Sequence, residues 1–169
     1  MYIEKVSDQK QIDIVATLAC KIWHEYFTPI IGKAQVEYML EKFQSTKSIE
    51  QQIKNGFIYF LLINNAEPIG YAGIFIKDSE LFLSKLYVVL AERNKGFGKQ
   101  VIVFLEDLAL EQGAKKITLT VNKNNSNTID AYQKMGFINV ESVIKNIGEN
   151  FVMDDYIMEK NLHRPFSNK

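Results

Sequence analysis

The chain has 169 residues, of which 47% are hydrophobic and 24% charged, a composition typical of a globular protein. Twenty Lys and Arg residues balance twenty Asp and Glu residues, so no overall basic charge favours nucleic acid or an anionic membrane as a partner. A single cysteine excludes an intrachain disulfide, and no run approaches the roughly 18 apolar residues of a membrane span. We therefore expect one cytoplasmic domain over residues 1–169.

The first part of the chain predicts a strand and a long helix. Residues 2–6 alternate like a strand, and Ser7 or Asp8 is suited to cap the helix that follows. This helix carries one apolar stripe, and Pro29 and Gly32 end it. The stripe consists of Val15, Leu18, Ala19, Ile22, Trp23 and Tyr26.

Two shorter helices are expected next. The first presents four apolar residues on one face, Val36, Met39, Leu40 and Phe43. The second has capping-box spacing at Ser48 and Gln51 and ends at Gly56. Cys20, beside the stripe of the long helix, is expected to be a packing residue rather than a nucleophile.

The rest of the chain predicts strands with one long helix and one short helix among them. The long helix follows from an apolar face that consists of Phe97, Val101, Phe104, Leu105 and Leu108. Six alternating or β-branched runs predict strands near residues 57–63, 68–77, 80–89, 117–121, 137–146 and 150–160. The last two strands should meet at residues 146–149, and residues 163–169 should fray.

A cationic turn rich in glycine separates the strand near residue 88 from the long helix. Such a turn points backbone N–H groups and a helix N-terminus at a ligand, which suits phosphate. Gly96 and Gly98 allow a ligand to approach the backbone closely, and Arg93, Lys95 and Lys99 supply charge-assisted donors. The turn is therefore predicted to bind a phosphate-bearing ligand.

Spacing excludes two common phosphate-binding motifs. A Walker A loop needs Gly where this chain has Arg93, and Ser or Thr where it has Gln100. A dinucleotide-binding turn needs a small residue where this chain has Val101. The pattern that remains is Arg-x-x-Gly-x-Gly after Leu-Tyr-Val. It resembles the acyl-CoA pyrophosphate loop of the GNAT superfamily of N-acetyltransferases.

A second segment, residues 121–137, strengthens this resemblance. It is similar to the GNAT segment in which an Asn opens a short helix and a Tyr precedes Lys-x-Gly-Phe. Asn125 and Tyr132 take these positions, while Thr128 stands where Ala is usual. The resemblance implies an α/β GNAT fold, with a mixed, mostly antiparallel sheet of about seven strands flanked by helices. Two strands of such a sheet should splay apart to hold acetyl-CoA.

The resemblance also implies roles for single residues. Tyr132 matches the tyrosine that protonates the departing CoA thiolate, whereas periodicity alone places it in the core beside Ile129 and Met135. Asn125 is either a helix cap, a coenzyme ligand or both, and Lys134 is either a solvated charge or a phosphate contact. The residues expected to bind the coenzyme are Tyr87, Val88, Val89, Arg93, Asn94, Lys95, Gly96, Phe97, Gly98, Lys99, Asn125 and Lys134.

The sequence does not assign a general base. Several GNAT enzymes carry a Glu on the strand before the loop, but here residues 82–85 read Phe-Leu-Ser-Lys, and Glu80 lies near the start of that strand. Aromatic rings and carboxylates elsewhere suit a cationic amine, although each charged group alone is also compatible with a solvated surface position. The residues expected to bind the acceptor are Trp23, His24, Glu25, Tyr26, Asp154 and Asp155.

We therefore expect an N-acetyltransferase that moves an acetyl group from acetyl-CoA directly to a small primary amine in a ternary complex. The chain loosely resembles the bacterial spermidine/spermine-type (polyamine) acetyltransferases. Acetylation of a protein or peptide amine, and acyl-CoA binding without transfer, remain as alternatives. No metal, nucleic acid or membrane is expected as a partner, since His24 and His163 are too few and too scattered for a metal site. A homodimer is left open.

Overall fold

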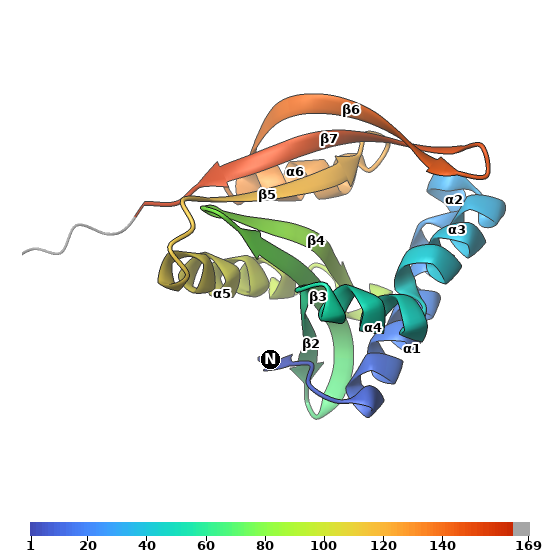
Figure 1. The fold of residues 1–169 in the computed structure, drawn as a ribbon, viewed down its shortest axis with the longest axis horizontal. Coiled ribbons are helices and arrows are strands. Elements are labelled where there is room, and N and C mark those ends of the chain that lie inside the picture. The colour runs from blue at the N-terminus through green and yellow to red at the C-terminus, as the bar shows by residue number, and fades with distance from the viewer. Residues whose placement is uncertain (164–169) are drawn as a thin grey trace, which may run out of the picture. The chain divides into compact units, whose positions relative to one another are not determined.

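The computed structural model describes residues 1–163, which contain seven strands (Figure 1). The strands are β1 (Tyr2–Lys5), β2 (Ile58–Asn64), β3 (Glu67–Lys77), β4 (Glu80–Val88), β5 (Lys116–Asn122), β6 (Ile138–Gly148) and β7 (Phe151–Asn161). They form one sheet in the order β1-β2-β3-β4-β5-β7-β6. β4 and β5 pair in parallel, whereas β1–β2, β2–β3, β5–β7 and β6–β7 are antiparallel. The predicted mixed, mostly antiparallel sheet is confirmed.

Helices connect these strands and flank the sheet. They are α1 (Gln9–Tyr26), α2 (Thr28–Ile31), α3 (Lys33–Met39), α4 (Thr46–Lys54), α5 (Phe97–Glu111) and α6 (Ser126–Lys134). Two short turns of other types are the π-helical η1 (Leu40–Gln44) and the 3-10 helical η2 (Leu90–Glu92). None of the helices in residues 1–163 combines the length and apolarity that a membrane crossing requires.

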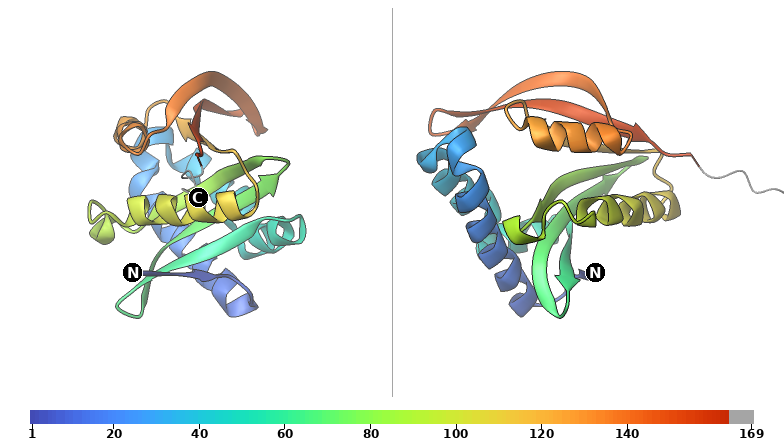
Figure 2. Two further views of the ribbon diagram at one scale, coloured as in Figure 1. Left: turned by 90° about the vertical axis from the view of Figure 1, so that its left-hand side faces the viewer. Right: turned by 180° about the vertical axis from the view of Figure 1, so that it is seen from behind.

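The chain divides into two compact units, and β4 contributes to both. The first unit comprises residues 1–75 and 84–98, with β1, β2, most of β3, the second part of β4 and helices α1 to α4. The second comprises residues 76–83 and 99 onward, with the first part of β4, nearly all of α5, β5, α6, β6 and β7. Figure 2 shows α6 lying alongside β5, β6 and β7 within the second unit.

Helix α1 begins at a complete capping box. The Asp8 side chain accepts a hydrogen bond from the Gln11 backbone N–H at 2.8 Å, and the Gln11 side chain accepts one from the Asp8 N–H at 3.3 Å. The predicted stripe is buried from Val15 to Trp23. The helix ends before Pro29, as expected, and this proline lies in the first turn of α2, where a missing N–H costs nothing.

Three predictions in this unit are wrong. Cys20 is exposed, because it lies about 100° around the helix from the buried Ala19. Helix α4 begins earlier than predicted, since Ser45 is its N-cap and accepts a hydrogen bond from the Ser48 N–H at 3.3 Å. The helix with the predicted apolar face changes to the wider π-turn η1 after Met39, which buries Gln44 and leaves Phe43 half-buried.

The second unit is centred on β5, which lies between the first part of β4 and β7. β5 pairs with β4 from Glu80↔Lys116 to Leu83↔Leu119 and with β7 from Lys116↔Asn161 to Asn122↔Asp155. The hairpin between β6 and β7 turns at Glu149 and Asn150, which both have positive φ. β6 therefore runs two residues further than predicted, and β7 begins one residue later. The predicted fraying concerns residues 164–169, which lie outside the described residues, and His163, which is exposed.

A glycine of β3 sets where the second part of β4 lies. A Cβ atom on Gly70 would be 2.3 Å from the Tyr87 carbonyl oxygen and 3.1 Å from the Val88 Cα. The neighbouring Ile69 carbonyl accepts a hydrogen bond from the Val89 N–H at 2.9 Å. Because both close atoms belong to backbone, neither can swing away as a side chain would. β3 and the end of β4 can therefore approach this closely only with glycine at this position.

We predict that Gly70→Ala destabilises the protein by about 1–3 kcal/mol, the usual cost of forcing an extra methyl group into a packed region. Gly98→Ala is the matched control, because a Cβ there meets no atom within 4 Å and its φ is not positive. Urea unfolding of both variants measures the difference. Equal stability of Gly70→Ala and the wild type would contradict the close approach of the two strands.

Candidate functional site

The turn between β4 and α5 is shaped by two residues with left-handed backbone conformations. After β4 ends at Val88, η2 makes one tight turn, and Asn94 and Gly96 then have φ values of 61° and 82°. Asn tolerates this region and Gly adopts it freely. Helix α5 begins at Phe97. The turn thus has the backbone shape that its glycine-rich sequence predicted.

This turn is open to a ligand. A Cβ atom on Gly96 or Gly98 would meet nothing within 4 Å. Asn94, Lys95 and Lys99 are exposed. Lys95 forms an ion pair with Glu92 at 2.9 Å, which reduces its net charge toward a ligand. The site consists of open backbone at the start of α5 with cationic side chains around it, an arrangement suited to an anion.

Arg93 links this turn to helix α1. Its Nε donates a hydrogen bond to the Val88 carbonyl at 2.9 Å, and its guanidinium carbon lies 4.0 Å from the centre of the Tyr26 ring. Burial lowers the pKa of Arg93, while Tyr26 and Glu25 act to raise it. The structure therefore brings together residues that the sequence placed in two different sites. The sequence did not predict that Arg93 contacts both the end of β4 and helix α1.

An aromatic cluster lies beside this turn. Tyr87 makes edge contacts with Trp23 and Phe27, at centroid distances of 5.6 and 5.8 Å, and packs against Tyr71 at 5.3 Å. Trp23 and Phe27 stack at 4.4 Å. Tyr71 is fully buried and donates a hydrogen bond to Gln44 at 3.2 Å. The expected site residues include Trp23 and Tyr87 but not Phe27 or Tyr71, whose apolar context is that of any core residue.

His24, another residue of α1 that is expected to bind the acceptor, lies close to a carboxylate of helix α3. The Nε2 atom of His24 lies 3.7 Å from a carboxylate oxygen of Glu37 on α3, and both side chains are partly exposed. Within residues 1–163, no group of three or more His, Cys, Asp or Glu side chains is placed to hold a metal ion.

A buried lysine, Lys85, lies in the part of β4 where the sequence has no carboxylate. Lys85 is 6% exposed, and its Nζ donates a hydrogen bond to Gln52 Oε1 at 2.6 Å. The Tyr59 hydroxyl donates to the same oxygen at 2.8 Å. The ammonium also lies 5.2 Å from the centre of the Tyr59 ring and 5.6 Å from that of Phe57. Burial lowers the pKa of Lys85 to about 8. The sequence alone indicated only that this part of β4 has no carboxylate, and it did not predict that Lys85 is buried.

Asn125 and Tyr132 lie at the two ends of α6 in the second unit. Asn125 is buried at the N-cap position, where its carbonyl accepts from Thr128 and Ile129 at 3.1 and 3.0 Å, but its side chain makes no capping hydrogen bond. Tyr132 is buried and contacts Phe137 edge to face at 5.4 Å. Burial raises the pKa of Tyr132, so its hydroxyl keeps its proton throughout the physiological range. Lys134 is exposed.

The two neighbouring aspartates of β7 have different surroundings. Asp154 forms an ion pair with Lys123, whose backbone N–H also donates to the Asp154 carbonyl at 3.0 Å. Asp155 is 3% exposed, and its Oδ1 has no hydrogen-bond partner among the described residues. Burial, with the negative charge of Asp154 adding to it and Lys123 opposing it, raises the pKa of Asp155 to about 6. Alternation along the strand separates these two carboxylates.

Glu80, the carboxylate nearest to the usual position of the base, is held in a polar network. It accepts a hydrogen bond from the Thr118 hydroxyl at 2.5 Å and lies 3.5 Å from the Lys116 ammonium. Lys116 also binds Glu159 at 3.1 Å. The network ties Glu80 to the start of β5, at the opposite end of β4 from the glycine-rich turn.

A mixed sheet with an open, glycine-rich turn after β4 agrees with the acetyltransferase fold that the sequence motifs predicted. The family model described as acetyltransferase (GNAT) family matches residues 15–137. The chain belongs to the acetyltransferase (GNAT) family.

Individual relatives and solved structures are similar to this chain at low sequence identity. The chain is 26% identical over 116 residues to a protein of Bacillus subtilis (strain 168) named uncharacterized N-acetyltransferase YobR. The match spans 69% of this chain and 45% of that relative, so it covers less than half of the relative's length. The PaiA N-acetyltransferase from Thermoplasma acidophilum, solved in complex with coenzyme A, has a TM-score of 0.75 at 20% identity, covering 95% of this chain and 99% of that one.

A second solved structure agrees with this fold. A GCN5-related N-acetyltransferase from Rhodopseudomonas palustris superimposes with a TM-score of 0.80 at 16% identity, covering 95% of each chain. Together these likenesses confirm the predicted GNAT fold.

The buried lysine gives the first unit a characteristic pH dependence. Between about pH 8 and pH 10.5, Lys85 has lost its proton in the folded state but keeps it in the unfolded state. The unfolded state then binds more protons, so this residue makes stability rise with pH across that window. We predict that Lys85→Met removes this rise and is the more stable protein near pH 7, since no charge is buried.

Urea unfolding of the wild type and Lys85→Met at about pH 7.5 and about pH 9.5 measures this difference. The stability advantage of the variant should shrink at the higher pH. A difference that is the same at both pH values would show that Lys85 is not deprotonated by burial.

Proposed function

We propose that this protein is an acetyl-CoA-dependent N-acetyltransferase that transfers the acetyl group directly to a primary amine. The observation that carries the proposal is the open, cationic turn between β4 and α5, where neither Gly96 nor Gly98 has an atom within 4 Å of a Cβ position. A backbone left uncovered at the N-terminus of a 15-residue helix suits a pyrophosphate. Membership of the acetyltransferase family supports the same ligand.

In this proposal, the turn after β4 binds the coenzyme through backbone groups and local charge. The pyrophosphate binds the N–H groups of residues 94–99, and Lys99 adds a charge-assisted donor. The pantetheine arm pairs with Tyr87, Val88 and Val89 as an added strand would. Because the Val89 N–H is bonded to β3, strand alternation directs the Val88 N–H to the other edge of β4. This N–H is the donor that would polarise the thioester carbonyl.

The reaction then needs two proton movements besides acetyl transfer. The amine lone pair attacks the thioester carbon, the new C–N bond forms, and the C–S bond breaks to release the CoA thiolate. Tyr132 donates its hydroxyl proton to that thiolate and regains one from the protonated amide. Burial makes Tyr132 a weaker acid than a free phenol, so the amide proton is essential to the overall balance. Asn125 binds the coenzyme beside it.

The acceptor in this proposal is a cationic amine, with a polyamine as the class that the sequence resemblance suggests. Trp23, His24, Glu25 and Tyr26 line its site on α1. Tyr26 and Glu25 support this assignment because both already interact favourably with a cation, Arg93. A cytoplasmic location and a homodimer remain predictions.

A second candidate function is acyl-CoA binding without transfer. It is favoured by one observation, which is that residues 82–85 of β4 include no carboxylate and that the lysine among them, Lys85, is buried. Turnover separates the two functions. Wild-type protein that binds CoA but acetylates no amine in a panel of polyamines, aminoglycosides and peptide N-termini would support binding alone.

We predict that Tyr132→Phe lowers turnover by about 100- to 10,000-fold, the usual contribution of general acid–base catalysis. The acetyl-CoA affinity should change little, because the variant keeps the ring that packs against Phe137. Release of CoA thiol with an accepted amine measures turnover, and calorimetric titration measures affinity. The loss should shrink with an acyl donor whose thiol is more acidic. Full turnover by Tyr132→Phe would show that the tyrosine is structural.

A further inference from the structure

Asp155 is a buried carboxylate that the second unit leaves incompletely bonded. The residue is 3% exposed, and its Oδ1 has no hydrogen-bond partner among residues 1–163. An ionised carboxylate buried without full hydrogen bonding is costly, and a catalytic role or a bound water, ion or ligand accounts for such groups in natural structures. The ligand that best completes a carboxylate is a cationic hydrogen-bond donor.

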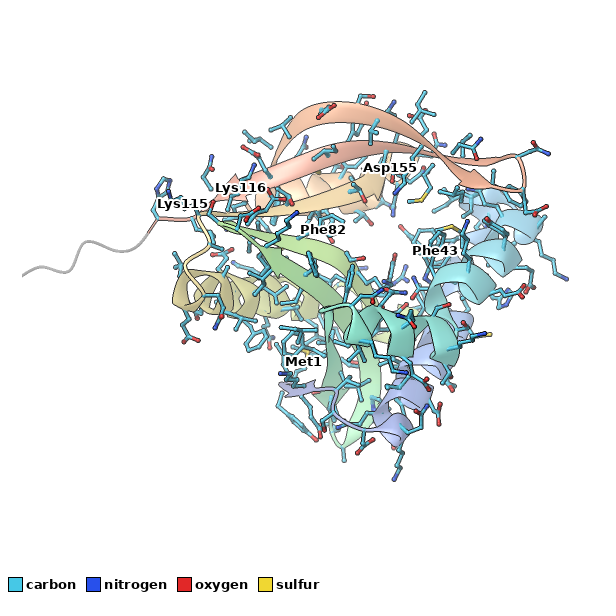
Figure 3. All side chains as sticks on the ribbon, in the orientation of Figure 1. Met1, Phe43, Phe82, Lys115, Lys116 and Asp155 are labelled. Carbon is cyan, nitrogen blue, oxygen red and sulfur yellow. The ribbon has the colours of Figure 1, made fainter. Side chains whose placement is uncertain are left out.

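Strand alternation separates Asp155 from the helices of its unit. Lys160, on the other face of β7, binds Glu106 of α5 at 2.5 Å. The Lys160 chain also lies 3.4 Å from the position of a Cβ on Gly136, just after α6. Helix α5 and the end of α6 therefore lie on the face of β7 that carries Lys160 and Asp154. By strand alternation Asp155, which is labelled in Figure 3, belongs to the opposite face.

The register places Asp155 at the end of β5. Its cross-strand partners are Asn122, the last residue of β5, and Val143 of β6. Asn122 begins the segment that leads into α6 and Tyr132. One strand spacing, roughly 5 Å, thus separates Asp155 from the end of β5, with the helix that carries the proposed acid following on the other face. A carboxylate on one face of the sheet and a tyrosine acid on the other, both beside the end of β5, suit an amine that attacks a thioester held at that strand end.

We propose that the Asp155 carboxylate binds the ammonium group of the acceptor and takes its proton before the amine attacks acetyl-CoA. This assignment rests on the proposed N-acetyltransferase function. The ammonium donates one proton to Asp155 and becomes a neutral amine, and its lone pair forms the C–N bond. Asp155 releases that proton to water when the amide product leaves.

The charges around Asp155 fit a base that works near neutral pH. Asp154 on β7 raises its pKa and Lys123 lowers it, with burial as the largest effect, to about 6. On the same face, β6 carries the exposed Glu141 and Lys145, and the β5 partner is uncharged. A carboxylate with this pKa is ionised at pH 7 and is a stronger base than an ordinary aspartate.

Asp154 provides a matched control. It carries the same group one residue away, but its carboxylate is paired with Lys123 on the opposite face. The structure therefore separates two residues that the sequence treated as equivalent acceptor ligands. Removal of Asp154 breaks an ion pair that is half exposed, and such pairs contribute little.

The test compares Asp155→Asn and Asp154→Asn with the wild type, with acetyl-CoA and spermidine as substrates. We expect Asp155→Asn to lower kcat/KM for spermidine by about 100-fold or more and to remove the rise of kcat/KM between about pH 5 and pH 7. Asp154→Asn should lose less than about fivefold and keep this rise. Coenzyme A affinity, measured by calorimetric titration, should be unchanged in both variants.

Two further outcomes separate this assignment from the proposed function. If Asp155 is structural, Asp155→Asn unfolds at a lower temperature than the wild type at about pH 7.5, whereas a ligand-binding role predicts an equal or higher midpoint. If the wild type binds CoA but acetylates no amine, the proposed function fails. In that case, weaker spermidine binding by Asp155→Asn alone still supports the ammonium site. Equal spermidine binding by all three proteins, or none by any, overturns it.

Discussion

The close approach of β3 to β4 is the constraint on which the candidate coenzyme site depends. With no side chain at Gly70, the Tyr87 carbonyl oxygen lies only 2.3 Å from where a Cβ atom would be, and the Val89 N–H donates a hydrogen bond to the Ile69 carbonyl. These contacts fix the last backbone groups of β4. The chain must then leave the strand through η2 and two left-handed residues before α5 begins. The result is an uncovered turn that is anchored at its β4 end, and anchoring of this kind reduces the reorganisation that backbone donors need to bind a ligand.

In each unit, burial shifts the pKa of one charged side chain, and this shift matters more than the total number of charged residues. The chain has no net charge, yet burial lowers the pKa of Lys85 to about 8 and raises that of Asp155 to about 6. Both groups thus titrate closer to neutrality than they would in water, and perturbed groups of this kind gather at functional sites. Lys85 is satisfied by Gln52, whereas Asp155 keeps an unbonded oxygen. That difference is why we assign a chemical role to the carboxylate.

Local patterns in the sequence predicted most of the helices, strands and turns, including the segments that form the candidate site. They did not predict which side chains of distant segments contact one another. The turn at residues 93–98 and the N-cap position of Asn125 were predictable because glycine, asparagine and periodicity act within a few residues. The bonding of Arg93 to Val88 and Tyr26 was not, since it joins a loop to a helix far away in the chain. Nor was the π-turn at Leu40–Gln44, which changes the buried face by one residue. The contrast between Asp154 and Asp155 depends on the β5–β7 register, which the sequence around these two residues does not reveal.

Gly98 offers the most direct measurement of the central claim, which is that the turn after β4 binds the coenzyme. A Cβ there meets no protein atom within 4 Å, and the residue lies in the first turn of α5 with ordinary helical backbone, so Gly98→Val should fold normally. Calorimetric titration with coenzyme A, beside far-UV circular dichroism, separates ligand approach from folding. The account predicts native dichroism and no measurable binding by Gly98→Val. Coenzyme A affinity equal to that of the wild type would contradict it.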